Sequence, residues 1–133
     1  MKYKFIDHTA DIAFEVYGKD LAELLENASY AFYEAFVYTE KVQKEYEKEL
    51  EIDAEEPDYL LYKWLNELLY LFDTEFFAAK EVKIKVENNK AIGKLIGGKF
   101  DSSMVKVEPK AITMHKFKVE KNDIWKAFVV IDI

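Results

Sequence analysis

The chain has 133 residues, 50% of them hydrophobic and 16% aromatic, so we expect one compact, ordered domain over residues 1–133. It contains no cysteine, which excludes disulfides, thiolate catalysis and cysteine-based zinc sites. The formal net charge is −7 and all 19 basic residues are lysines. Affinity for nucleic acid comes largely from neutralised phosphates, and arginine binds phosphate best. A negative net charge without arginine therefore argues against strong direct binding of RNA or DNA.

The first third of the chain predicts two strands and a helix. Short strands over residues 2–6 and 12–17 flank a polar run at residues 7–11. Asp20 then precedes an amphipathic helix. Apolar residues at three- and four-residue spacings mark its buried face: Leu21, Leu24, Leu25, Ala28, Ala31, Phe32, Ala35 and Phe36.

A second helix and further strands follow. Residues 42–52 carry charges at nearly every other position, which predicts an exposed strand. Asp53 and Glu56 have the spacing of a capping box, and the helix that follows runs from Pro57 to Phe72 or a little beyond. Its apolar surface is wide, so it should contact the core on more than one side. The remaining strands are expected at residues 82–86, 91–96, 111–119 and 124–131, with a turn at Asn88-Asn89 between the first two.

These elements define an α+β fold in which two main amphipathic helices pack on a largely antiparallel β-sheet. No signal-peptide pattern opens the sequence. Its longest apolar stretch, Tyr59 to Phe72, is interrupted by polar side chains and is not a membrane span. We therefore expect a soluble, cytoplasmic protein without a membrane partner. Its acidic surface favours cations or a basic protein partner, although it is also typical of solvated ion-pair networks.

The first cluster of candidate site residues is the polar run between the two N-terminal strands: Asp7, His8, Thr9 and Asp11. Aspartate and threonine commonly bond backbone groups in turns, so Thr9 has a purely structural explanation. His8 is ambiguous, because a histidine bonded to a backbone carbonyl gives the same pattern. Asp11 lies at the mouth of an apolar strand and is the stronger candidate for function.

The second cluster lies at the C-terminal end. In the last predicted strand, Phe128 and Val130 share a face with Lys126 and Asp132, so Asp132 ends an almost fully buried run. A buried carboxylate requires a cation, N–H donors or water. The main-chain carboxylate of Ile133 adds another anion. Two or three carboxylates at one point suit Ca²⁺, Mg²⁺ or Mn²⁺, although charges at chain ends are often simply solvated.

The third cluster is the segment from Lys110 to His115. If the strand is regular, Thr113 and His115 share an apolar stripe with Ala111, Phe117 and Val119. They are then either satisfied core residues or polar groups that converge with His8 beside the carboxylates. Neither histidine has the spacing of a zinc motif, and no dinucleotide fingerprint, P-loop or nucleophile elbow is present. We therefore expect no organic cofactor and find little sign of an enzyme.

Four segments together resemble the archease family. They are residues 8–12 near the start, residues 64–70 in the second helix, residues 110–113 followed by His115, and Asp132-Ile133 at the end. The resemblance covers essentially the full chain, with the motifs in the family's order. Met114 departs from the pattern, because an aromatic residue is expected there.

The resemblance implies a function. Archeases are non-enzymatic activators of a GTP- and Mn²⁺-dependent tRNA-splicing RNA ligase, promoting its guanylylation and multiple turnover. Asp11, Asp132 and the terminal carboxylate of Ile133 would then bind a divalent cation such as calcium. Supporting roles or ligase contacts would fall to the remaining motif residues, which are Asp7, His8, Thr9, Lys110, Thr113 and His115.

Two alternatives remain. One is a metal-dependent phosphoester hydrolase that uses Asp11, Asp132 and His8 or His115 as metal ligands and base. The other is a general chaperone or scaffold that binds its clients through an exposed apolar patch.

Overall fold

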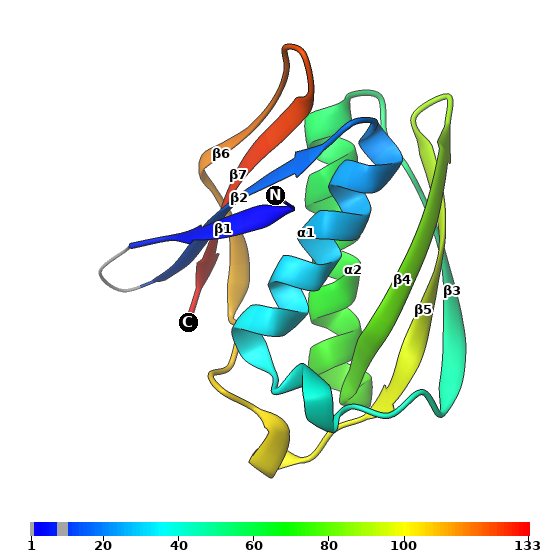
Figure 1. Ribbon diagram of the computed structural model, residues 1–133, viewed down its shortest axis with the longest axis vertical. Helices are drawn as coiled ribbons and strands as arrows, with labels where there is room; N and C mark the ends of the chain where they lie inside the picture. Colours follow the sequence, from blue (N-terminus) through cyan, green and yellow to red (C-terminus); the bar gives the residue numbers. More distant parts are fainter. Residues whose placement is uncertain (1, 8–10) are drawn as a thin grey trace.

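A computed structural model describes residues 2–7 and 11–133 of the chain, in which two antiparallel sheets enclose two helices (Figure 1). One sheet has four strands in the order β1-β2-β7-β6, and the other has three in the order β3-β5-β4. The predicted α+β class, with two helices on antiparallel strands, is confirmed. The division into two sheets depends on strand order, which the sequence pattern does not reveal.

The N-terminal elements follow the predicted order. β1 spans Tyr3–Ile6 and pairs with β2, which spans Asp11–Gly18. Helix α1 spans Leu21–Phe36 and begins where expected, because the side chain of Asp20 accepts a hydrogen bond from the Glu23 amide at 2.8 Å.

The start of the second helix differs from the prediction. Strand β3 spans Tyr46–Asp53, so Asp53 ends a strand and does not cap a helix. Helix α2 spans Pro57–Glu75; Glu56 is its N-cap residue and makes no side-chain capping bond within the described residues. The capping-box prediction is therefore wrong. Asp53 pairs with Lys90 in the sheet, and this tertiary pairing overrides the local spacing.

The remaining strands form two hairpins. β4 spans Phe77–Glu87 and β5 spans Lys90–Lys99, joined by Asn88 and Asn89. These two residues have φ values of 51° and 61°, the left-handed conformation that a tight two-residue hairpin turn requires and that asparagine tolerates. β6 spans Ala111–Lys121 and β7 spans Trp125–Asp132.

The core lies between the sheets, where α1 and α2 lie side by side (Figure 1). At its centre, the fully buried Trp64 donates a hydrogen bond from Nε1 to Ser29 Oγ at 2.8 Å, and Ser29 donates to the Leu25 carbonyl at 2.8 Å. A Cβ atom at position 93 would lie 2.5 Å from the Trp64 ring, which explains the glycine there. In the described part of the chain, neither helix is long and apolar enough to cross a membrane.

Candidate functional site

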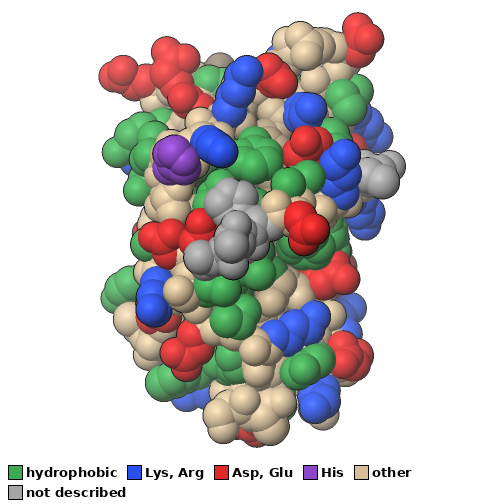
Figure 2. Space-filling view, turned by 90° about the vertical axis from the view of Figure 1, so that its left-hand side faces the viewer, with side chains coloured by type: hydrophobic (Ala, Val, Ile, Leu, Met, Phe, Trp, Pro, Cys, Tyr) green, Lys and Arg blue, Asp and Glu red, His purple; other side chains and the backbone are tan. Residues whose placement is uncertain are grey.

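Asp11 and Asp132 lie directly opposite each other on neighbouring antiparallel strands. Asp11 is the first residue of β2 and Asp132 is the last of β7, and the two are register partners. Phe14 and Val16 of β2 face the helices and are fully buried, so the alternation of the strand places Asp11 on the opposite, outward face. Figure 2 views the molecule from the side of this sheet, where acidic side chains lie beside hydrophobic ones.

Strand β6 holds the end of β7 from its other side. Ala111 is the register partner of Asp132, and the backbone amide of Lys110 donates a hydrogen bond to the Asp132 carbonyl at 2.7 Å. The last residues of the chain are therefore part of an ordered sheet, and Ile133 follows directly with an exposed fraction of 36%. This arrangement brings Asp11, Asp132 and the terminal segment together, as the sequence analysis expected.

The expected burial of Asp132 is wrong. Its neighbours Val130 and Ile131 are buried, but the Asp132 side chain is exposed, because it ends the strand on the outward face. Asp11 is half-buried. The carboxylate of Asp132 therefore keeps its contact with water.

The prediction that Thr113 and His115 share one apolar stripe is also wrong. The pairing of β6 with β7 shifts register between Thr113 and Lys118, and Lys116 adopts φ 60°. This irregularity changes which residues face the core: Thr113 pairs with Val130 on the outward face, whereas Phe117 packs edge-on against Tyr62 of α2.

The two polar residues of that segment therefore lie at the surface. The side chain of Thr113 accepts a hydrogen bond from the backbone amide of His115 at 3.1 Å, and His115 itself is exposed. Lys110 and Asp7 are exposed as well. His8 and Thr9 lie outside the described residues, so the predictions for them remain untested.

The far end of the same face carries a second polar group that the sequence analysis missed. Glu15 accepts a hydrogen bond from the Tyr17 hydroxyl at 2.6 Å and forms an ion pair with Lys126 at 3.7 Å. The bond from Tyr17 is the main reason that the pKa of Glu15 is lowered, and it raises the pKa of Tyr17 to about 12. The alternation of Asp11, Ala13 and Glu15 along β2 was the available signal for Glu15.

The two ends of this face carry different groups. At the far end Glu15 forms an ion pair with Lys126, and at the near end Asp11 and Asp132 are register partners. Register partners have Cβ atoms about 4.5–5.5 Å apart, a distance at which like charges destabilise a sheet. In the described part of the chain no ion pair involves Asp132, so the near end is an acidic site at the surface.

The donor set fits a hard cation only in part. The carboxylates of Asp11 and Asp132 are oxygen ligands of the kind that Ca²⁺ and Mg²⁺ prefer. Among residues 2–7 and 11–133, however, no group of three histidine, aspartate or glutamate side chains is arranged to hold a metal ion. A cation bound here would therefore need further ligands besides these two side chains.

The chain is an acidic α+β protein with two antiparallel sheets around two helices, and Asp11 of β2 and Asp132 of β7 are register partners in one of these sheets. The chain belongs to the archease family: the model described as "Archease protein family (MTH1598/TM1083)" matches residues 3–133.

Curated relatives and solved structures agree with this assignment. Protein archease of Archaeoglobus fulgidus is 64% identical over 137 residues that cover 100% of both chains. Protein archease of Methanosarcina barkeri is 36% identical, covering 99% of this chain and 96% of the relative.

The fold is shared with two solved structures. The solution structure of Methanobacterium thermoautotrophicum protein 1598 is 36% identical, with a TM-score of 0.84 and 98% of each chain covered. The crystal structure of a Thermotoga maritima archease, described as a possible chaperone, is 31% identical with a TM-score of 0.69, covering 98% of this chain and 96% of that one.

Proposed function

We propose that the protein is a non-enzymatic activator of a GTP- and Mn²⁺-dependent tRNA-splicing RNA ligase in the cytoplasm, promoting the guanylylation and multiple turnover of that enzyme. The observation that carries the proposal is the register pairing of Asp11 with Asp132 in a chain of the archease family. The carboxylate of Asp132 lies at the surface, where a second protein has access to it.

The acidic pair is proposed to hold one divalent cation, Ca²⁺, Mg²⁺ or Mn²⁺. Its ligands would be Asp11, Asp132 and the main-chain carboxylate of Ile133. A bound cation supplies positive charge that offsets the repulsion between the facing carboxylates. The backbone hydrogen bond from Lys110 to Asp132 holds the end of β7, which carries Asp132 and directly precedes Ile133.

The surroundings of the pair support a protein partner. The exposed side chains of Asp7, Lys110 and His115 and the half-buried Thr113 come from segments beside it and would contact the ligase. A net charge of −7 without arginine favours a basic, metal-loaded protein over tRNA as the molecule that is bound.

A multiple-turnover ligation assay with the partner ligase tests this proposal. Asp11→Asn and Asp132→Asn remove one charge each without changing side-chain size, and both should abolish stimulation. Glu15→Gln is the matched control, because it makes the same change on the same face of β2 at the lysine-paired end. Full stimulation of the ligase by folded Asp11→Asn and Asp132→Asn proteins would contradict the proposal.

A general chaperone is the second candidate, because the Thermotoga maritima relative is described as a possible chaperone. The exposed large apolar side chains of the described residues include Tyr70 at 59%, Phe76 at 56% and Met114 at 55%. Tyr70 lies on α2, Phe76 directly follows α2, and Met114 lies on β6, so more than one element contributes apolar surface. Capture of many unrelated proteins, unaffected by a chelator, would favour the chaperone function.

A further inference from the structure

The two sheets have four edge strands, and three of these edges are closed or irregular within the described structure. β1 and β6 border the four-stranded sheet, and β3 and β4 border the three-stranded sheet. β1 has only four residues, and β6 shifts register next to the left-handed Lys116. Short or irregular edge strands are poor templates for another strand.

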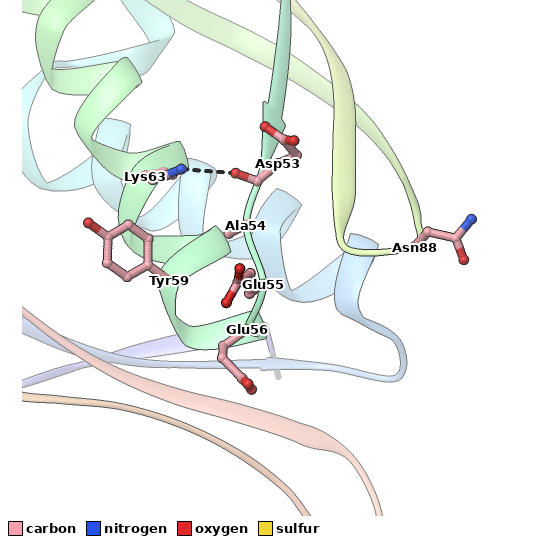
Figure 3. A pocket seen from close by; sticks show the side chains of 7 residues that line it. All are labelled: Asp53, Ala54, Glu55, Glu56, Tyr59, Lys63 and Asn88. Atoms are coloured by element: carbon pink, nitrogen blue, oxygen red, sulfur yellow. Dashed lines mark hydrogen bonds between the residues drawn. The ribbon is translucent and has the colours of Figure 1, made fainter.

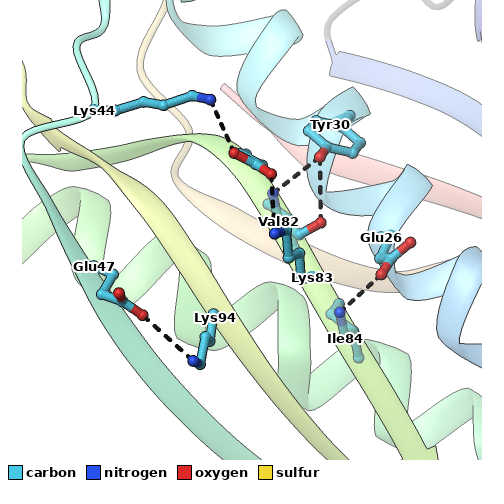
Figure 4. A network of polar contacts seen from close by, with 9 residues as sticks. Glu26, Tyr30, Lys44, Glu47, Val82, Lys83, Ile84 and Lys94 are labelled. Atoms are coloured by element: carbon cyan, nitrogen blue, oxygen red, sulfur yellow. Dashed lines mark hydrogen bonds and ion pairs between the residues drawn. The ribbon is translucent and has the colours of Figure 1, made fainter.

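The edge of β4 is closed by side chains from α1. The Tyr30 hydroxyl accepts a hydrogen bond from the Val82 amide at 2.9 Å and donates one to the Val82 carbonyl at 3.2 Å. Glu26 accepts a bond from the Ile84 amide at 2.8 Å (Figure 4). These three bonds occupy backbone groups that a new strand would need.

β3 is different, because it pairs residue for residue with β5 over all eight positions. The Ala54 amide donates to the Asn89 carbonyl at 3.1 Å, immediately beyond the register pair of Asp53 and Lys90. Asp53 and Lys90 are therefore a non-hydrogen-bonded pair, and the backbone groups of Asp53 point away from β5. The hydrogen bond from Lys63 supports this orientation, because the side chain of Lys63 on α2 donates to the outward carbonyl of Asp53 at 3.0 Å (Figure 3).

The same alternation of hydrogen-bonded and non-hydrogen-bonded pairs points the backbone amide and carbonyl of every second β3 residue away from β5. The amides and carbonyls of Glu47, Glu49 and Glu51 point to the edge, as those of Asp53 do. Along this outward edge, the only hydrogen bond formed within the described part of the chain is the one from Lys63. In Figure 1, β3 lies on the side of the molecule opposite the four-stranded sheet. Its outward groups form an open template for a further strand.

The side chains of the same four residues make this edge acidic. All four are exposed and lie on the outer face of the sheet. Glu51 lies 3.1 Å from Lys90. Glu47 lies 3.9 Å from Lys94, and Figure 4 draws this second pair. These ion pairs are largely exposed and weak, so they leave the carboxylates accessible to a second cation.

The inner face beside the edge is partly apolar. Leu50 and Ile52 alternate with the glutamates and are half-buried against the core. A pocket between β3 and α2 is lined by Ile52, Tyr62 and Asn66 together with four charged residues, Glu51, Asp53, Lys63 and Glu67. The inward side chains of an added strand would cover these groups.

We propose that β3 is a strand-addition site for an extended segment of a partner protein in which lysine or arginine alternates with aliphatic residues. In the antiparallel arrangement, the basic side chains lie opposite Glu47, Glu49 and Glu51 on the outer face, and the aliphatic ones cover the pocket beside Ile52 and Tyr62. Backbone bonds supply affinity, and the alternation supplies specificity. A second copy of β3 is a poor occupant, because it would place glutamate opposite glutamate.

This site is independent of the Asp11–Asp132 pair, which lies on the other sheet. An experiment that disproves the strand-addition site therefore does not disprove the proposed function, and the reverse also holds.

Amide hydrogen exchange of the full chain, measured by NMR, tests the proposal. The probe is a synthetic peptide that alternates lysine with valine, and the control is the same peptide with glutamate in place of lysine. The lysine peptide should bind saturably, more weakly at high salt, and should protect the amides of Glu47, Glu49 and Glu51. The amides of Lys48 and Leu50 already bond to β5 and should change little. Binding without protection of the three glutamate amides would overturn the proposal, as would equal binding of the two peptides.

A proline variant separates backbone pairing from charge. Glu49→Pro removes one outward N–H group without removing a bond to β5, and it should weaken peptide binding beyond the effect of Glu49→Gln by about three- to tenfold. Because proline also fixes the backbone angle φ at position 49, a peptide methylated at its lysine amides provides the same test on the unaltered protein. Unchanged affinity of the methylated peptide contradicts strand addition. A dimer of the chain that protects the same glutamate amides contradicts the basic partner.

Discussion

Asp11 and Asp132 are register partners, the first residue of β2 facing the last residue of β7. Removing one of the two charges should stabilise the metal-free protein, because like charges on register partners repel each other. We expect Asp132→Asn to raise the free energy of unfolding by about 0.2 kcal/mol in chelator at low salt, at the lower end of the usual range, since Asp132 is exposed.

Adding a divalent cation should make the wild-type chain more stable than Asp132→Asn. At a concentration one hundred times its dissociation constant, Ca²⁺ should stabilise the wild-type chain by about 2.7 kcal/mol and leave Asp132→Asn nearly unchanged. Denaturant unfolding with and without Ca²⁺ measures both effects. Equal stabilisation of wild type and variant would show that Asp132 is not a ligand.

The bond between Trp64 and Ser29 should contribute strongly to stability. Ser29→Ala leaves the Trp64 N–H group buried without its acceptor, which should cost about 1–3 kcal/mol. Adding Trp64→Phe to the same protein should cost less than the sum of the two single changes, because the phenylalanine has no donor to satisfy. Denaturant unfolding of the three variants measures this coupling, and strict additivity would contradict it.

Glu15 and Tyr17 should contribute to the stability of the protein with opposite pH dependence. The folded-state pKa of Glu15 is lowered, so the stability it contributes is present above its ordinary pKa of 4.5 and is lost as pH falls through the lowered value. The folded-state pKa of Tyr17 is raised to about 12, so its contribution is present below its ordinary pKa of 10.0 and is lost as pH rises through about 12. NMR titration should show the pKa of Glu15 rising in Tyr17→Phe, and an unchanged pKa would exclude the hydroxyl as its cause.

The Tyr30 hydroxyl should protect the edge of β4. Tyr30→Phe removes the partner of both Val82 backbone groups, and we expect a loss of about 1–2 kcal/mol in unfolding free energy together with faster exchange of the Val82 amide. The Ile84 amide, which bonds to Glu26, is the internal control and should exchange at its original rate. Equal acceleration of both amides would indicate general destabilisation.

Local patterns predicted the local structure well. The Asp20 cap, the apolar face of α1 and the Asn88-Asn89 turn each depend on residues a few positions apart, and the structure contains all three. The capping box at Asp53 and Glu56 was equally local, but sheet pairing overrode it.

Non-local features were beyond the reach of sequence patterns. The irregularity in β6 reverses which residues face the core, so Thr113 and Phe117 lie on opposite faces although their spacing predicts one face. The meeting of Asp11 and Asp132 depends on the register between β2 and β7, which no local spacing encodes. It was the full-length resemblance to archeases that suggested it, and the register confirms the meeting. The ligands of the proposed cation site remain a prediction.

The most direct test of the proposed function is ligase guanylylation at limiting ligase, with GTP and Mn²⁺. Wild type, Asp132→Ala and a chain extended past Ile133 are compared, since the extension displaces the terminal carboxylate without changing any side chain. We predict stimulation by wild type and none by either altered protein, with both retaining the wild-type circular dichroism spectrum. Full stimulation by Asp132→Ala would contradict the role of the carboxylate pair.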